Sequence, residues 1–302
     1  MAGLLRALFG KPAPVPAPTE EDWREVLEWP LFDGLTQPER AQVRALAERL
    51  LAEKTVSPVS GAEPAGRDIA AVAAQAALPV LNLGAGWYGT WNEIILYPEQ
   101  FVPEREITDD FGVVHRVRQP LSGEAWEGGP LILSLDDVAE REITDDFGVV
   151  HRVRQPLSGE AWEGGPLILS LNDVAASGWR DGYNVVIHEF AHKLDMKNGA
   201  VDGLPPLHSD MDAGGWAAAF EPAFNDFRRR VDHAERVGRE LDLDPYASES
   251  PAEFFAVLSE YFFELPDLLA AEYPAVYAQM RRFYRQDPLK RLEAFSHDPP
   301  TP

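Results

Sequence analysis

Apolar residues recur at helical spacing along most of the chain, and this periodicity predicts a mainly helical protein. The segment 37–54 shows it most clearly, because Val43, Leu46 and Leu50 lie among Glu and Arg residues. Further helices are predicted after Thr19 and at 67–78, 184–195, 216–237, 251–263 and 273–284. Thr19 and Ser250 precede acidic residues and are candidate N-caps.

Strand-like runs are short and lie mainly in the middle of the chain, at 55–59 and 91–97 and then in a repeated segment. Residues 104–135 recur without change as residues 140–171. Solenoid repeats diverge in sequence and come in threes or more, so two identical copies indicate a recent tandem duplication. Each copy carries two strand-like runs, at 112–117 and 130–135 in the first and at 148–153 and 166–171 in the second.

Both copies contain the strands for one place in a sheet, and only one set can occupy it. We therefore expect one composite copy in the sheet and about 36 residues extruded as a surface insertion, which costs little loop entropy. The domain prediction follows from this: a flexible, Pro-rich tail at 1–18, a single domain at 19–292 that contains the repeated segment 104–135/140–171, and a polar tail at 293–302.

The chain has 302 residues and a formal net charge of −23, from 50 acidic and 27 basic residues. The electrostatic field of this net negative charge repels polyanions, so we expect no direct binding to nucleic acid or to an anionic membrane. The apolar run within residues 1–10 is too short for a transmembrane helix or a secretory signal. The chain has no Cys, which fits a reducing compartment;. We expect a cytoplasmic protein.

The strongest chemical signal is an H-E-x-x-H motif formed by His188, Glu189 and His192 within the predicted helix 184–195. Residues four apart share a helix face, so the two imidazoles can bind one metal ion. Glu189 lies about 100° around the helix from His188, where it flanks the metal and can act as a base. Two His ligands and a third protein ligand leave one position open, as a catalytic zinc requires. Asn184 is a candidate N-cap for this helix.

The third ligand must be His, Asp or Glu, because there is no Cys;. Glu253 and Glu260 lie seven residues apart and share one face of the predicted helix 251–263. Glu253 is equally suited to a capping box with Ser250, and Glu260 to a solvated helix face. Spacing alone does not decide which of the two glutamates is the third metal ligand.

Three further residues receive other interpretations. Asp195 lies one turn beyond His192, and we expect it to accept a hydrogen bond from a ligand His or from the following loop. The repeated His115 and His151 are expected to be ordinary strand or loop residues and not ligands.

Two segments carry a resemblance: the motif region 187–195, and 246–263 with Tyr246, Glu253 and Glu260. They resemble the Mlc titration factor A family of zinc peptidases, and the similarity extends from about residue 37 to residue 289. The duplication is the main departure from the family. The resemblance implies an α+β, zincin-like domain, mostly helical, with a small mixed sheet beside the H-E-x-x-H helix. It also implies Zn²⁺ bound by His188, His192 and Glu253, with Tyr246 as an essential tyrosine.

The motif and the resemblance together imply a zinc-dependent, aminopeptidase-like enzyme, with Glu189 as the general base and the Tyr246 hydroxyl stabilising the oxyanion. A strand of the repeat, at 166–171 or its twin, is expected to lie along the cleft, where its edge can pair with a peptide substrate. The alternative is a binding protein that sequesters a transcriptional repressor, with peptidase activity secondary or impaired by the duplication.

Overall fold

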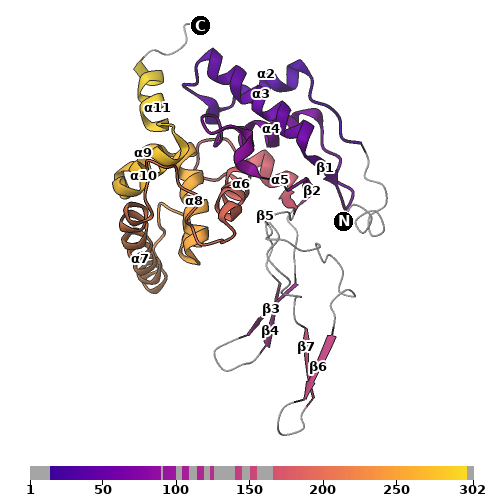
Figure 1. Ribbon diagram of the computed structural model, residues 1–302, viewed down its shortest axis with the longest axis vertical. Helices are drawn as coiled ribbons and strands as arrows, with labels where there is room; N and C mark the ends of the chain where they lie inside the picture. The colour runs from indigo at the N-terminus through magenta and orange to yellow at the C-terminus, as the bar shows by residue number, and fades with distance from the viewer. Residues whose placement is uncertain are drawn as a thin grey trace.

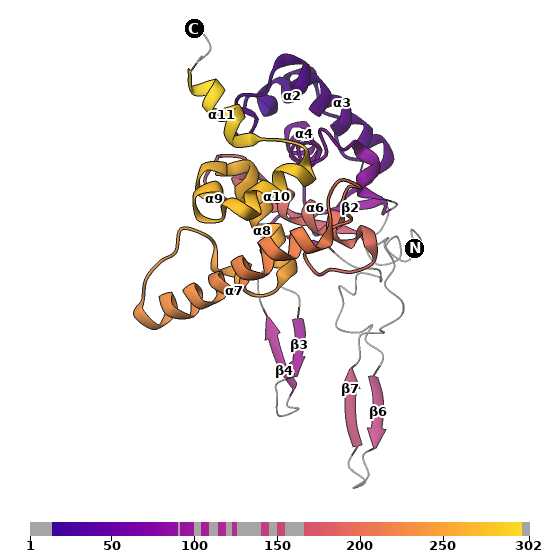
Figure 2. The same cartoon turned by 60° about the vertical axis from the view of Figure 1, so that its left-hand side comes forward.

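The computed structural model describes residues 14–89, 91–99 and 166–297. Between them it describes only the backbone of strands at 104–108, 114–118, 123–125, 140–144 and 150–154. Figures 1 and 2 show the arrangement of the elements.

The α-helices of the described residues are α2 (Glu20–Leu27), α3 (Gln37–Glu53), α4 (Gly66–Ala77), α5 (Leu171–Ala176), α6 (Val185–Asp195), α7 (Ala213–Val237), α8 (Pro251–Glu264), α9 (Pro266–Glu272), α10 (Pro274–Tyr284) and α11 (Pro288–His297). Short 3₁₀ helices are η1 (Pro30–Phe32), η2 (Ala85–Tyr88), η3 (Met196–Asn198) and η4 (Pro245–Ser248).

The main sheet has four strands in the order β1 (Thr55–Pro58), β2 (Glu93–Tyr97), β8 (Leu167–Ser170) and β5 (Gly123–Ala125). The first three are parallel, and β5 pairs antiparallel with β8. All four residues of β8 are buried, as expected for an inner strand covered on both faces;. The prediction of a mostly helical α+β fold with a small mixed sheet is confirmed.

The sheet draws one strand from each copy of the repeat, because β5 belongs to the first copy and β8 to the second. Each copy also forms a two-stranded antiparallel hairpin, β3 (Glu104–Thr108) with β4 (Val114–Arg118) and β6 (Glu140–Thr144) with β7 (Val150–Arg154). The two hairpins have equivalent register. The predicted strand at 130–135 lies outside the described residues, and the extrusion of the surplus segment stays a prediction.

Helix α6 occupies the middle of the molecule, between a group formed by α2, α3 and α4 and a group formed by α8, α9 and α10 (Figures 1 and 2). Alanine-rich α4 is buried along almost its whole length, and its small side chains allow helices to approach from several sides;. On the other side, every residue of α8 from Phe254 to Glu264 is buried. The motif helix is thus enclosed by core.

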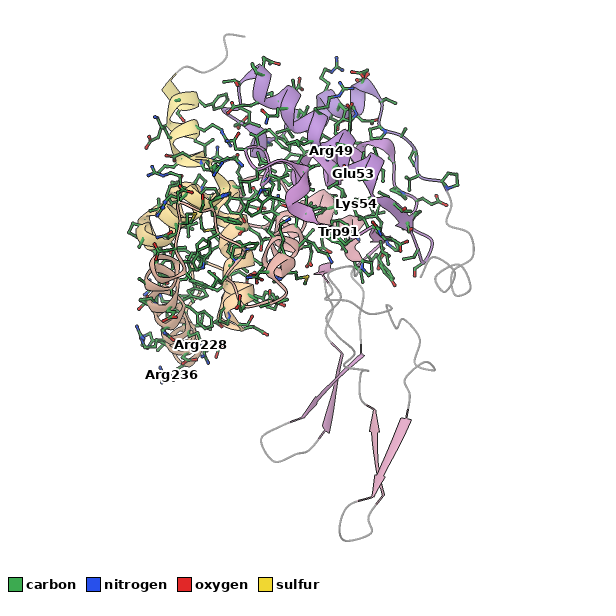
Figure 3. All side chains as sticks on the ribbon, in the orientation of Figure 1. Arg49, Glu53, Lys54, Trp91, Arg228 and Arg236 are labelled. Carbon is green, nitrogen blue, oxygen red and sulfur yellow. The ribbon has the colours of Figure 1, made fainter. Side chains whose placement is uncertain are left out.

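Trp91 connects the sheet to α6 through two buried lysines. The Lys54 ammonium lies 4.3 Å from the Trp91 ring centroid and also donates to the Trp91 carbonyl (Figure 3). The Lys193 ammonium lies 5.3 Å from the same centroid and 3.5 Å from the Pro166 carbonyl oxygen, just before β8. These contacts stabilise the position of the C-terminal half of α6 on the sheet.

Described residues near both chain ends pack against the core or form helix, and the predicted division into two tails and one domain stays a prediction. Val15 is partly buried and packs against the core. Helix α11 continues to His297, past the predicted start of the C-terminal tail at 293. It begins at Pro288, a residue favoured in a first turn, and Leu289 packs against the core;.

No helix in the part of the chain described here combines the length and the apolar character needed to cross a membrane.

Candidate metal centre

Helix α6 presents His188 and His192 on one face, as the motif predicts. Its first turn is capped by Asn184, whose Oδ1 accepts a hydrogen bond from the Ile187 amide at 2.9 Å. The predicted N-cap is therefore confirmed. Both imidazoles are buried, and their rings meet edge to face with centroids 4.9 Å apart.

Glu253 reaches the two imidazoles from α8. Its backbone amide donates to Ser250 Oγ at 3.1 Å, which caps the helix, while its side chain turns to the histidines instead of closing a capping box. The sequence left open whether the Glu253 side chain completes a helix cap or joins the histidines. In the structure the Ser250 hydroxyl caps α8, and the Glu253 carboxylate lies against the two histidines.

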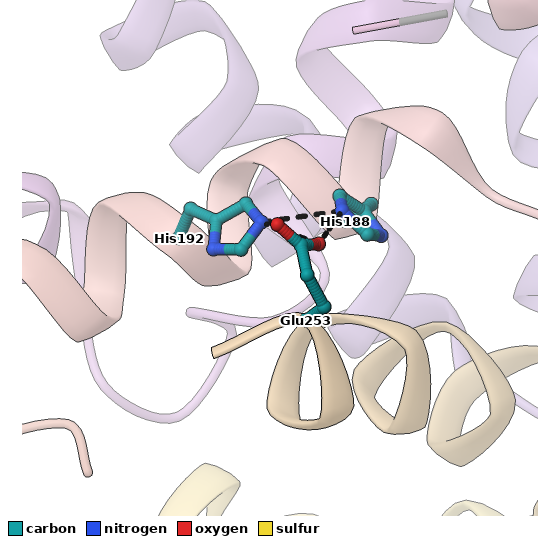
Figure 4. Close-up of side chains that lie close together, drawn as sticks. All are labelled: His188, His192 and Glu253. Carbon is teal, nitrogen blue, oxygen red and sulfur yellow. Dashed lines mark hydrogen bonds and ion pairs between the residues drawn. The ribbon is translucent and has the colours of Figure 1, made fainter. Parts of the chain in front are cut away.

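The three side chains converge on one point (Figure 4). Glu253 Oε2 lies 3.1 Å from His188 Nε2 and 3.3 Å from His192 Nε2, and the two Nε2 atoms are 3.2 Å apart. An ion held tetrahedrally by bonds of about 2.0–2.1 Å needs donors about 3.3–3.4 Å apart, so this spacing fits a metal. Among the described residues these three form the group able to hold an ion.

The protonation states of two of the three side chains suit a bound cation. Burial raises the pKa of Glu253, but its contacts with the two imidazoles outweigh burial and hold that pKa well below its ordinary value of 4.5. Burial lowers the pKa of His192, which favours the neutral form that binds metals;. His188 is different: burial opposes its charge, yet hydrogen bonds to Glu253 and Glu260 raise its pKa well above 6.5.

Glu189 is buried beside this cluster, with 4% of its surface exposed. Its negative charge contributes to raising the pKa values of His188, the preceding residue, and of Lys193, four residues after Glu189 on α6. Burial lowers the pKa of Lys193 to about 8, and the nearby Glu189 carboxylate opposes that shift. The predicted base therefore directly follows one candidate metal ligand in the sequence and lies about one helical turn before a buried lysine.

Tyr246 lies on η4, immediately before α8, and is half-buried. Its ring centroid is 6.0 Å from that of His188, with the planes inclined at 37°. The Tyr246 amide donates to Asp244 Oδ1 at 2.9 Å, which fixes the backbone of this short helix. The residue named from the resemblance is thus brought against the first histidine of the motif.

Glu260 is the site residue whose role the spacing did not identify. It is 5% exposed, so the solvated helix face considered for it is wrong. Its Oε1 lies 2.8 Å from His188 Nδ1, and its Oε2 accepts a hydrogen bond from the Asn184 amide at 2.5 Å. The seven-residue spacing from Glu253 was the available signal, because it places both carboxylates on the same face of α8.

Glu264 continues this row one turn further along α8. It is fully buried and accepts hydrogen bonds from the Asn184 side chain at 2.7 Å, from the Gly178 amide at 3.1 Å and from the Arg180 amide at 2.5 Å. Burial raises its pKa to about 7, although these bonds oppose the shift. Asn184 therefore contacts two glutamates of α8, Glu260 with its backbone and Glu264 with its side chain.

Asp195 ends α6 and is fully buried. Its Oδ2 accepts a hydrogen bond from the Gly203 amide at 2.8 Å, so the expected contact is with the loop. Gly203 has a φ of +76°, and a Cβ there would meet the Pro251 carbonyl oxygen at 2.3 Å. The loop after the motif helix is thereby held tightly against the start of α8, two residues before Glu253.

One prediction about the cleft is corrected. The strand at 166–171 was expected to offer an edge to a peptide, but β8 pairs with β2 on one side and β5 on the other. The outer strand on this side is β5. The side chains of His115 and His151 lie outside the described residues, so their predicted lack of a ligand role stays a prediction.

Comparison with known proteins agrees with this geometry. A family model described as glucose-regulated metallo-peptidase M90 matches residues 13–142 and 137–285, two ranges that each include one copy of the repeat. Mlc titration factor A of Serratia proteamaculans is 37% identical over 279 residues, 92% of this chain and 91% of the relative. Mlc titration factor A of Yersinia pestis (strain Pestoides F) is 36% identical over 276 residues, 91% of this chain and 88% of the relative. The chain belongs to the M90 family of glucose-regulated metallopeptidases.

Proposed function

We propose that this protein is a zinc-dependent, aminopeptidase-like enzyme of the cytoplasm that hydrolyses peptide bonds. The observation that carries the proposal is the convergence of His188 Nε2, His192 Nε2 and Glu253 Oε2 within 3.3 Å of one another. Two imidazoles and one carboxylate form the ligand set of many peptidase zinc sites, and they leave a position for water or substrate.

The chemistry divides among the residues beside these ligands. Zinc, when bound, supplies Lewis acidity that polarises the scissile carbonyl and lowers the pKa of water. Glu189 accepts the proton of the attacking water and returns it to the leaving amine. Tyr246, against the His188 ring, donates its hydroxyl proton in a hydrogen bond to the carbonyl oxygen as negative charge develops there;.

The substrate is proposed to be an extended peptide that lies along β5, the strand on this side of the sheet. An antiparallel edge strand can bind a peptide through main-chain hydrogen bonds. The net charge of −23 favours neutral or basic peptides over acidic ones at long range;.

The test compares wild type with Glu189→Gln, using amino-acid anilides and short peptides as substrates and measuring zinc content in parallel. We expect wild type to cleave the anilides and the variant to retain one zinc but lose activity by at least about 100-fold. Equal activity of the two proteins would contradict the role of Glu189. Failure of wild type to bind zinc would contradict the metal site.

A second candidate function comes from the names of the relatives, which are titration factors for Mlc. In this alternative, the chain is a binding protein that sequesters a transcriptional repressor. Its net negative charge suits a basic DNA-binding partner;. Binding of a purified Mlc-like repressor by the Glu189→Gln variant, without cleavage, would favour this function over hydrolysis.

A further inference from the structure

One histidine of the site is held between two glutamates of the same helix. His188 Nε2 lies 3.1 Å from Glu253 Oε2, and His188 Nδ1 lies 2.8 Å from Glu260 Oε1. We propose that Glu260 is a positioning residue: it fixes the His188 ring with its proton on Nδ1 and thereby directs the Nε2 lone pair at the metal. The inference rests on the metal site of the proposed function.

The position of Glu260 is itself fixed by α6. Its second oxygen accepts the Asn184 amide at 2.5 Å, and Asn184 is the N-cap of the helix that carries His188. The carboxylate therefore bridges the start of α6 and a side chain one turn later on that helix. A buried carboxylate with both oxygens hydrogen-bonded has little freedom to rotate, so it sets both the tilt of the imidazole and its tautomer.

His192 provides an internal contrast. Its Nε2 joins the cluster as that of His188 does, but its buried Nδ1 has no hydrogen-bond partner within the described part of the chain. No described residue orients this ring through Nδ1, whereas Glu260 contacts His188 at that atom. Removal of Glu260 should therefore disturb one ligand and leave the other in place.

The test uses the full-length zinc-loaded protein with Glu260→Ala and Glu260→Gln. Wild type should show a slowly exchanging His188 Nδ1–H resonance by NMR, and chelator competition should give its zinc dissociation constant. We expect Glu260→Ala to lose the resonance and to bind zinc about 10- to 100-fold more weakly. Glu260→Gln should be intermediate, because the amide oxygen can serve only one of the two donors, His188 or Asn184.

Glu264→Gln is the matched control, since Glu264 is buried on the same helix without contacting His188. It should lower the melting temperature but keep both the resonance and the zinc affinity. If Glu260→Ala does not fold, the Glu260→Gln variant decides. Wild-type affinity and an unchanged resonance in the folded Glu260 variants would overturn the inference and leave the metal site standing. A wild type without zinc affinity would instead contradict the site.

Discussion

The amide group of Asn184 and the carboxyl group of Glu264 lie 2.7 Å apart, although 80 residues separate them in the chain. This contact joins the N-terminus of the motif helix to the last turn of α8. It also makes the start of α6 sensitive to pH, because burial raises the pKa of Glu264 from 4.5 to about 7.

The first prediction is a pH dependence of folding that Glu264 causes. Between pH 4.5 and 7 the folded protein retains a proton that the unfolded chain has released. The retained proton stabilises the folded state. The stabilisation is fully present below about pH 4.5 and is lost as the pH rises through about 7, and its total is about 3 kcal/mol. Denaturant unfolding of metal-free wild type and Glu264→Gln, from pH 5 to 8, should show a smaller decline for the variant. An equal decline of the free energy of unfolding in the two proteins would contradict the raised pKa of Glu264.

The second prediction concerns metal removal. A ligand that binds only the folded state stabilises it by about 4 kcal/mol at 1,000 times its dissociation constant, which corresponds here to a melting shift on the order of 10 °C. A strong chelator should therefore lower the melting temperature of the zinc-loaded protein by that amount. His192→Ala, which lacks one donor, should melt at the same temperature with and without chelator.

The third prediction separates the Tyr246 hydroxyl from its ring. Tyr246→Phe keeps the ring that lies against His188 and removes only the hydroxyl. We expect kcat to fall about 100- to 1,000-fold, as for other lost oxyanion donors, with KM and zinc content near wild type. Steady-state kinetics and metal analysis would check it. A fall in zinc content matching the loss of kcat would instead assign the tyrosine to ligand placement.

The fourth prediction concerns the repeat. Deletion of residues 126–161 joins Ala125 directly to Trp162 and restores a single copy. The shorter connection between the edge strand and β8 should stabilise the protein by about 2 kcal/mol through reduced loop entropy. Unfolding curves and zinc binding would be measured for both chains. Loss of zinc binding on deletion would show that the second copy is needed for the fold.

The convergence of the two histidines of α6 could be predicted because their pattern is local. The spacing of His188 and His192 and the cap at Asn184 depend on one helix alone. Ser250 and Glu253 were ambiguous for the same reason, since a capping box is also local and only the packing of α8 against α6 decides which way the side chain turns.

The roles of Glu260 and Glu264 could not be assigned because α8 is buried throughout from Phe254 to Glu264 and has no polar face there to reveal its orientation. A helix whose residues are all enclosed gives no periodicity from which to infer the role of an acidic residue. The short helices α5 and α9 escaped prediction because each spans two turns or fewer. The pairing of β5 with β8 was not predicted, because β5 has only three residues and lies between the strand-like runs of its copy.

The composite sheet has a consequence for how this chain selects its native pairing. Gly123–Ala125 is the edge strand, and the same three residues recur at 159–161, nearer to β8 along the chain. Side-chain chemistry cannot distinguish two identical segments, so at equilibrium the preference between them comes from the flanking chain, chiefly from the entropy of closing the connecting loop. A label placed in one copy would therefore report the difference in loop-closure free energy between the two pairings, without any substitution in the strand.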